Sequence, residues 1–145
     1  MFLGEDTHSL DEKGRVVLPR RFRDALADGC IVAKGEDHQL LVFTREAYER
    51  KAAEVMAAPA TRAGRRVQRI FFSGADEQTL DKAGRLLLKG ELRSYAELVE
   101  GGEVKVLGLY HHIELWNPEM FSADKARGEE DFTRDDEDLE EDNDD

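Results

Sequence analysis

The chain contains one segment twice. Residues 10–19 read LDEKGRVVLP, and seventy positions later residues 80–89 read LDKAGRLLLK. When the first 26 residues are aligned with the segment seventy positions later, nine of the 26 positions are identical. A second pair of segments, GEDHQLLVFTREAY at 35–48 and GLYHHIELWNPEMF at 108–121, also matches after three residues are inserted in the second copy. Such a repeat constrains the fold strongly, because each copy is one structural unit that buries its open surfaces against the other.

Each copy has the pattern of a small β-rich unit. A strand leads into an Asp-x-x-Gly turn, an apolar triplet (VVL or LLL) follows the arginine, and a helical turn (RRFRDAL or GELRSYA) comes next. Two more strands follow, CIVAKG and LLVF in the first copy and EVKVLG and IELW in the second. Thr44 and Asn117 then stand where a helix begins, and both are good N-cap residues. The expected class is therefore α+β.

Helical segments join the two copies. One pattern, TREAYERKAAEVMAA, stops before Pro59, and a second, TRAGRRVQRIFFSG, ends near Gly74. Two halves with strands this short would each leave open sheet edges, and pairing them into one closed barrel removes those edges. We therefore expect a barrel whose repeats are related by an approximate two-fold, with both turns on one common face. The expected division of the chain is a first repeat at 1–52, linking helices at 53–74, a second repeat at 75–126 and a tail at 127–145.

The Asp-x-x-Gly-Arg turn holds one residue that its geometry does not require. Aspartate can accept the backbone N–H groups of a turn, and glycine three residues later supplies a left-handed conformation. A guanidinium is needed for neither task. Each aspartate is either the partner of a merely structural arginine or a device that positions the arginine for phosphate or for the O6 and N7 acceptors of guanine. The residues concerned are Asp11, Gly14 and Arg15 in the first copy and Asp81, Gly84 and Arg85 in the second.

Further basic residues surround the two turns. Lys13 and Lys82 lie inside them, and Arg20 follows the first apolar triplet, so we expect these three to contact DNA beside Arg15 and Arg85. A second group falls at helical spacing i, i+3, i+4, i+7 and would share one helix face, which is most often simply solvated. Its members are Arg62, Arg65, Arg66 and Arg69. Whether that stripe touches DNA, or whether Arg69 ties the helix to the barrel, stays open.

The net charge of −12 is concentrated at one end. Residues 122–145 hold 13 acidic and three basic residues, whereas residues 1–121 hold 20 acidic and 18 basic ones. We expect a nearly neutral domain with an acidic tail that is disordered from about residue 127. The tail is either a solubility extension or a competitor that shields a basic face. In the second case, deletion of residues 128–145 should raise DNA affinity, most of all at low salt.

Other classes of protein fit the sequence poorly. No apolar run is long enough to span a membrane, and the N-terminus lacks the features of a signal peptide, so we expect a cytoplasmic protein. The single cysteine, Cys30, lies in an apolar run and is expected to be a buried hydrophobe. Four histidines form no metal-binding or nucleophile motif, and the glycines build no phosphate loop. We expect no enzyme, no metal, no cofactor and no small-molecule substrate.

The chain resembles the MraZ family of bacterial transcriptional regulators. The resemblance rests on MFLGEDTHSLDEKGRVVLPRRFR, RRVQRIFFSGA, DKAGRLLL followed by LRSYA, and the closing ELW, and it covers about residues 1–121. It implies a swapped-hairpin, AbrB-like barrel made of two repeats, ring-shaped homo-oligomers and association with the nucleoid. It also implies binding of double-stranded DNA at short G-containing direct repeats upstream of the division and cell-wall gene cluster. The family's Asp-x-x-x-Arg signature falls on Asp11 with Arg15 and on Asp81 with Arg85.

Two features depart from the family pattern. Lys89 and Gly90 stand where the family often has proline after the second apolar triplet, whereas the first copy keeps Pro19. The acidic tail is not explained by the family motif either. An antitoxin of the AbrB-like class, which binds DNA and a protein partner, is the alternative function. Such antitoxins carry one repeat and a tail with apolar anchors, whereas this chain has two repeats and a tail almost without anchors.

Overall fold

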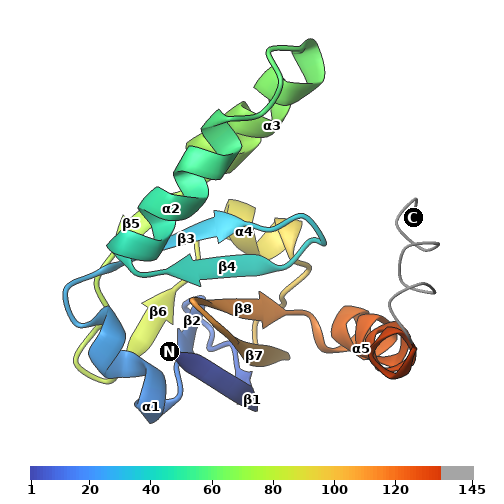
Figure 1. Cartoon of the computed structure of the whole chain (residues 1–145). Helices are drawn as coiled ribbons and strands as arrows, with labels where there is room; N and C mark the ends of the chain where they lie inside the picture. Colours follow the sequence, from blue (N-terminus) through green and yellow to red (C-terminus); the bar gives the residue numbers. More distant parts are fainter. Residues whose placement is uncertain (135–145) are drawn as a thin grey trace.

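The fold is known from a computed structural model that describes residues 1–134. Its strands form a six-stranded antiparallel sheet in the order β1-β7-β8-β4-β3-β5 and a separate two-stranded sheet of β2 and β6 (Figure 1). The elements of the first half are β1 (Phe2–Ser9), β2 (Arg15–Val17), α1 (Arg20–Arg23), the 3-10 turn η1 (Asp24–Leu26), β3 (Cys30–Lys34), β4 (Leu40–Phe43), α2 (Arg45–Met56) and α3 (Arg62–Ser73). Those of the second half are β5 (Asp76–Gln78), β6 (Arg85–Leu87), α4 (Gly90–Tyr95), β7 (Glu103–Tyr110), β8 (His112–Trp116) and α5 (Pro118–Thr133). The α+β class is confirmed.

The closed barrel is wrong. Within the described residues β1 pairs only with β7, and β5 pairs only with β3, so the large sheet keeps two edges. The edges cannot meet because β5 is only three residues long, whereas β1, its counterpart in the first repeat, has eight. The two-stranded sheet covers the open side instead, and a single bridge between Leu10 and Val16 links it to the end of β1.

The two repeats are interleaved and do not fold side by side. β1 of the first repeat pairs with β7 of the second, β5 of the second pairs with β3 of the first, and β2 pairs with β6. If the repeats are exchanged, the strand order of the large sheet reads the same from its other edge. An approximate two-fold therefore passes between β4 and β8 and between β2 and β6, as the repeat predicts.

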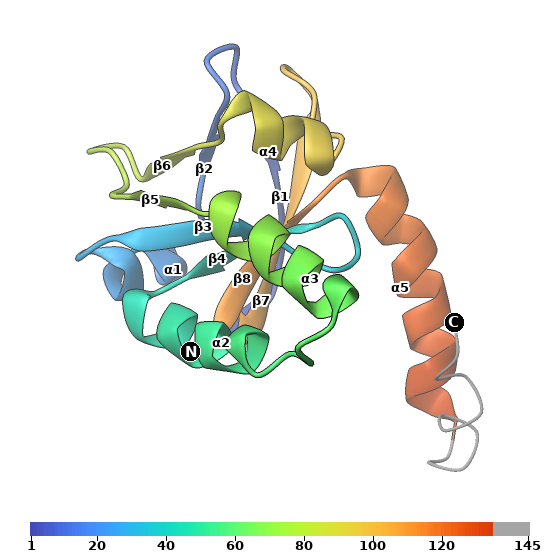
Figure 2. The same cartoon turned by 90° about the horizontal axis from the view of Figure 1, so that it is seen from above.

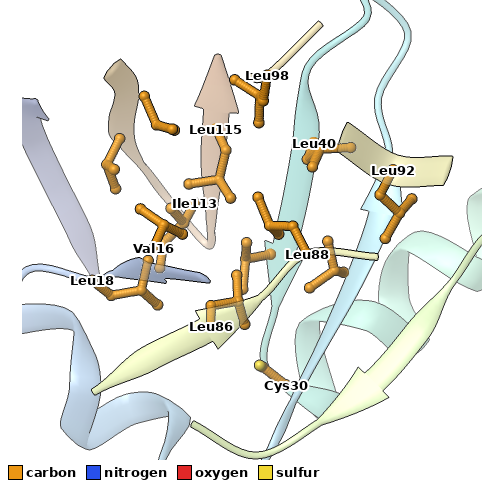
Figure 3. Close-up of a cluster of buried hydrophobic side chains, with 14 of the residues drawn as sticks. Val16, Leu18, Cys30, Leu40, Leu86, Leu88, Leu92, Leu98, Ile113 and Leu115 are labelled. Carbon is orange, nitrogen blue, oxygen red and sulfur yellow. The ribbon is translucent and has the colours of Figure 1, made fainter. Parts of the chain in front are cut away.

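Alternation along the strands divides the apolar side chains between two cores. Leu40 and Ile113 of the large sheet join Val16 and Leu86 of the β2–β6 ribbon in the main core (Figure 3). Cys30 belongs to the same core, and its burial is confirmed; that burial, with the nearby charge of Asp76, raises the pKa of the thiol to about 11.

The second core lies on the opposite face of the large sheet, under α2 and α3. It contains Ala33, Leu41, Phe43, Ala47 and Phe71. The β2–β6 ribbon and the α2–α3 hairpin therefore cover opposite faces of the sheet, and Figure 2 shows the hairpin over β3 and β4.

The long helices begin where the sequence indicates, because a side chain caps each of them. Thr44 accepts a hydrogen bond from the backbone N–H of Ala47, and Asn117 accepts from those of Glu119 and Met120. The second of these helices, α5, corrects the predicted tail, since residues 127–133 are helical. A capped helix propagates at little cost per residue, even though α5 buries none of its side chains. The disorder predicted for residues 135–145 lies outside the described residues.

Candidate nucleic-acid interface

Both repeated turns have the geometry that their sequence predicts. Asp11 Oδ1 accepts the backbone N–H groups of Lys13 and Arg15, each at 2.9 Å, and Asp11 Oδ2 accepts from Arg15 Nε at 2.8 Å. In the second turn Asp81 Oδ1 accepts from the N–H groups of Ala83 and Arg85, and Asp81 Oδ2 accepts from Arg85 Nε at 2.7 Å. One carboxylate in each copy thus holds both the turn and the guanidinium.

These hydrogen bonds favour the charged form of each aspartate. The backbone N–H of Arg15 is the largest influence that holds the pKa of Asp11 below its ordinary value, and that of Arg85 does the same for the pKa of Asp81. Each carboxylate is therefore ionised at neutral pH. Each arginine donates to its aspartate through Nε alone. Within residues 1–134, the two terminal amino groups of each arginine make no hydrogen bond. Both side chains are partly exposed, 26% for Arg15 and 33% for Arg85, so a ligand can approach them.

The register of the ribbon places both arginines on one face. Arg15 lies opposite Leu87, and Val17 lies opposite Arg85. Residues directly opposite each other in an antiparallel pair share a face, and so do residues two apart in one strand, so these four side chains form the outer face. Diagonal neighbours of this kind are about 7–8 Å apart between Cα atoms. The two turns themselves lie at opposite ends of the ribbon.

Each turn is also braced by the other repeat. Leu18 N donates to Gly84 O at 3.1 Å, and Leu88 N donates to Gly14 O at 2.8 Å. A side chain on Gly84 would lie 2.3 Å from Nε of Arg23, and one on Gly14 would lie 2.4 Å from Nη1 of Arg93. Both glycines have a positive φ, 79° at Gly14 and 77° at Gly84. Glycine is therefore required twice over, by the backbone and by the arginine of the other repeat.

Arg23 and Arg93 are the residues whose part in the site sequence reasoning missed. They are identical in the two copies, and that identity was the available signal. Arg23 Nε donates to Leu18 O at 2.9 Å, so this arginine ties the end of its own β2 to the turn of the second repeat. Arg93 approaches Glu100 at 3.4 Å while it covers Gly14.

The remaining predicted contact residues surround the ribbon. Lys13 and Lys82 are exposed within the two turns, and Arg20 is exposed at the start of α1, directly after β2. None of these three forms an ion pair with any residue from 1 to 134. Arg20 has no basic counterpart, because Gly90 occupies the equivalent place in α4. The cationic part of the interface is therefore larger on the first repeat.

The Lys89-Gly90 departure leaves the second copy in register. Lys89 is the N-cap of α4, as Pro19 is of α1, so both short helices begin at equivalent positions. Lys89 Nζ also forms a 2.9 Å ion pair with Asp76. The charge of Lys89 is thus engaged within the chain.

The arginine stripe of α3 lies away from the ribbon. Its four members, Arg62, Arg65, Arg66 and Arg69, are exposed on the helix that covers the opposite face of the large sheet. The stripe and the β2–β6 ribbon therefore lie on opposite sides of the sheet. Arg69 forms no ion pair to the sheet within residues 1–134, so it does not tie α3 down in that way.

One buried carboxylate lies on that opposite face. Glu114 accepts from Trp116 Nε1 at 2.9 Å and from Gln39 Nε2 at 3.2 Å, and His112 Nε2 lies 3.2 Å away. Burial raises the pKa of Glu114, but the hydrogen bonds from His112, Trp116 and Gln39 outweigh burial and hold that pKa below its ordinary value of 4.5. The network therefore stabilises the fold only while Glu114 is ionised.

This network predicts a loss of stability in acid. Because the folded-state pKa is lower than the unfolded one, the stabilisation is present above about pH 4.5 and is lost as the pH falls through the folded-state value. Urea denaturation at pH 7 and pH 4 should show that Glu114→Gln loses less stability on acidification than the unchanged protein does. Equal losses in both proteins would contradict the prediction. Glu119→Gln, an exposed change on α5, is the control.

Comparison with known proteins agrees with the repeat. The family model described as "MraZ protein, putative antitoxin-like" matches the chain twice, over residues 1–70 and again over residues 71–143. The chain belongs to the MraZ family. Several curated MraZ relatives, each named "Transcriptional regulator MraZ", are similar over most of their length. The protein of Saccharopolyspora erythraea is 44% identical over 92% of this chain and 93% of its own. That of Roseiflexus castenholzii is 43% identical over 81% and 82%, and that of Desulforamulus reducens is 41% identical over 91% and 92%.

Membership of the MraZ family places the chain among transcriptional regulators, which are not a class of enzymes. Across residues 1–134, no helix has the length and apolar character needed to cross a membrane. The same residues contain no group of three or more histidine, cysteine, aspartate or glutamate side chains arranged to hold a metal ion.

Proposed function

We propose that this protein is a sequence-specific regulator of transcription that binds double-stranded DNA with the outer face of the β2–β6 ribbon. One observation supports this above all others: two guanidinium groups lie on one partly exposed face, each held by a carboxylate through Nε alone. The major groove of B-DNA is about 12 Å wide and admits a two-stranded β-ribbon. Arginine donors that stay free can then pair with guanine O6 and N7.

The proposed roles follow from position. Arg15 and Arg85 are the primary contacts, and Asp11 and Asp81 position them while Gly14 and Gly84 shape the turns. Lys13, Lys82 and Arg20 contact backbone phosphates, because ammonium and guanidinium groups at the rim of the ribbon meet the strands on either side of the groove. Leu87, which is 47% exposed between the arginines, suits a thymine methyl group.

An oligomer strengthens this weak single contact. We propose a ring-shaped homo-oligomer built from the swapped-hairpin, AbrB-like fold, nucleoid-associated in the cytoplasm, on direct repeats upstream of the division and cell-wall gene cluster. Interleaved strands in the described residues support the swapped-hairpin part of this proposal. Ribbons held at a fixed spacing convert several weak contacts into avidity when the DNA repeats have a matching spacing. A nearly neutral domain then needs no large basic patch.

The decisive experiment is a binding titration on the protein's own upstream DNA, with footprinting to define the repeats. The unchanged protein should protect evenly spaced short repeats, and Arg15→Ala should lose that protection while it stays folded and oligomeric. Protection that survives both Arg15→Ala and Arg85→Ala would contradict the assignment of the ribbon.

Asp11→Asn separates positioning from charge. The carbonyl oxygen of asparagine can still accept from the two backbone N–H groups. The NH₂ group that replaces Oδ2 only donates, so it cannot accept from Arg15 Nε, and the guanidinium loses its support. We expect DNA affinity to fall about 3- to 10-fold, even though a negative charge has been removed from the DNA-facing side. Glu12→Gln, an exposed change in the same turn, removes the same charge and should leave affinity equal or higher. If both variants bind more tightly, Asp11 acts only through its charge.

An antitoxin-type protein is the alternative function, and the family description names that likeness. A wrapping segment needs apolar anchors, and in α5 the aromatic residue Phe132 is 90% exposed near the helix end. A toxin that co-purifies in stoichiometric amount would favour the alternative. Recovery of the chain only with copies of itself favours the regulator.

A further inference from the structure

The face opposite the ribbon carries a cleft of about 530 Å³ that the proposed DNA contact does not use. Its floor is the sheet surface under the helices, and α3 forms one wall. We call the part of the cleft beside α3 the α3 groove. Six residues line it: Leu41, Phe43, Lys51, Arg66, Val67 and Ile70. Val67 and Ile70 are more than half exposed although both are large and apolar. A surface of this kind is characteristic of a docking site.

The helix that forms this wall is strongly cationic on its exposed side, beside the α3 groove, and of its arginines Arg66 lines the cleft itself. The helix segment Arg62–Ser73 contains four arginines and no acidic residue. Among the described residues none of the four forms an ion pair, and the single hydrogen bond of Arg65, to Ala60 O, is long at 3.5 Å. Most other basic side chains of the domain have acidic partners, as Arg45 has Glu77. The cleft is lined by acidic residues, Glu36, Asp37 and Glu114, as well as by basic ones. The carboxylates of an acidic segment would therefore lie along the exposed arginines of α3, with an apolar side chain of that segment against Val67 and Ile70.

The chain itself contains such a segment. Residues 135–145 read DDEDLEEDNDD, with nine acidic residues and one large apolar residue, Leu139. They follow α5, which ends at Thr133, and eleven residues reach about 36 Å when extended.

α5 passes beside the cleft before the segment begins. Burial raises the pKa of Asp124 on α5, and so do the charges of Asp37 and Glu114, two residues that line the same cleft. Figure 2 shows α5 running on one side of the loop after β3, with α3 on the other side of that loop.

We propose that the acidic C-terminal segment 135–145 docks in the α3 groove, with its carboxylates on Arg62, Arg65, Arg66 and Arg69 and Leu139 against Val67 and Ile70. DNA phosphate is the competing ligand for the arginine stripe. It is disfavoured because the ribbon that we assign to DNA covers the other face of the sheet. The docked segment then keeps the exposed stripe from binding nucleic acid nonspecifically, which leaves DNA contact to the ribbon.

Photocrosslinking in the full chain tests the docking. Leu139 is replaced by the photoreactive amino acid benzoylphenylalanine, and crosslinked peptides are mapped by mass spectrometry. We expect the crosslinks to fall on residues 51–70, and their yield to drop about tenfold at 0.5 M NaCl, where screening is strong. A mixture of ¹⁵N-labelled and unlabelled chains tells whether the segment docks on its own chain or on a neighbouring copy, and either result supports the proposal.

Two charge variants make the outcome decisive. Changing all four stripe arginines to glutamate should abolish the crosslinks, and so should changing the nine tail acids to asparagine or glutamine, which leaves the folded domain untouched. Arg45→Glu with Arg50→Glu, an exposed pair on α2, should leave the yield unchanged. Crosslinks concentrated on the two turns at Arg15 and Arg85 would overturn the proposal and make the segment a direct competitor of DNA. Crosslinks scattered over the surface, unaffected by salt, would overturn it in favour of a solubility extension.

Discussion

If the ribbon binds DNA repeats as proposed, Arg15→Ala should lower the affinity of this protein for them by at least about tenfold. A bidentate arginine–guanine contact contributes about 1–3 kcal/mol of discrimination, which corresponds to roughly 5- to 150-fold for one contact. Every chain of an oligomer carries the change, so the loss grows with the number of ribbons that bind together. Fluorescence anisotropy with a duplex of two or more repeats, at a fixed salt concentration, measures this loss.

The dependence of the affinity loss on base sequence and on salt concentration shows which DNA group the arginine contacts. If Arg15 reads guanine, the variant should tolerate substitutions at one base of the repeat that the unchanged protein rejects. If Arg15 contacts phosphate, affinity should fall equally on all sequences, and the salt dependence should weaken by about one unit of slope. Arg50→Ala, an exposed arginine that pairs with Glu46 on α2, is the matched control and should bind normally. A folded, oligomeric Arg15→Ala protein with unchanged affinity would remove Arg15 from the interface.

Arg85→Ala should act in the same direction, and comparison of the two variants tests the two-fold. The arginines occupy diagonal positions on one face and have nearly equal support, 2.8 Å and 2.7 Å from their aspartates. Their surroundings differ, because Arg20 flanks the first copy whereas Lys89 of the second is paired with Asp76. We therefore expect Arg15→Ala to lose more affinity than Arg85→Ala if phosphate contacts dominate the binding. Equal losses would show that the base contacts dominate.

Much of the geometry of the two turns could be predicted from residues alone, because a turn is a local structure. Asp11, Gly14 and Arg15 lie within five positions, and their hydrogen bonds need no knowledge of distant strands. The repeat likewise indicated a two-fold. The face shared by Arg15 and Arg85 was expected, but the reason for it, the pairing of Val16 with Leu86, is a contact seventy residues apart in the chain.

The features that sequence reasoning missed depend on unequal lengths and on distant contacts. Closure of the barrel failed because the three-residue strand β5 cannot match the eight residues of β1, and strand ends are poorly defined by composition. The last turns of α5 were mistaken for a disordered tail because acidic composition says nothing about a helix already started by Asn117. The correction also changes the truncation to be made, which should begin after residue 134 and keep α5 whole.

The bracing of each turn by the other repeat predicts the largest loss of stability from a small change. In Gly84→Ala a methyl group must occupy a φ of 77° and would lie 2.3 Å from Arg23 Nε, which is hydrogen-bonded to Leu18 O. The left-handed conformation costs about 1–2 kcal/mol, and displacement of a bonded guanidinium costs about 1–2 kcal/mol more. We expect the free energy of unfolding to fall by about 2–4 kcal/mol, measured by urea denaturation at pH 7.

Gly101→Ala provides a matched control for the backbone term. Gly101 has the same φ of 77°, but no atom lies within 4 Å of the position that a side chain would take. Its alanine variant should lose only the conformational part, about 1–2 kcal/mol. The difference between the two variants is then the cost of pushing Arg23 away from the turn.

A double-mutant cycle identifies Arg23 as the neighbour responsible. Arg23→Ala alone removes the hydrogen bond to Leu18 O, and in that background Gly84→Ala should cost no more than Gly101→Ala does. If Gly84→Ala costs the same with and without Arg23, the side chain of Arg23 does not brace the second turn. Coupling between the two positions means instead that the turn carrying Arg85 depends on the folded first repeat for its shape, so Arg15 and Arg85, the two proposed DNA contacts, depend on one folded unit.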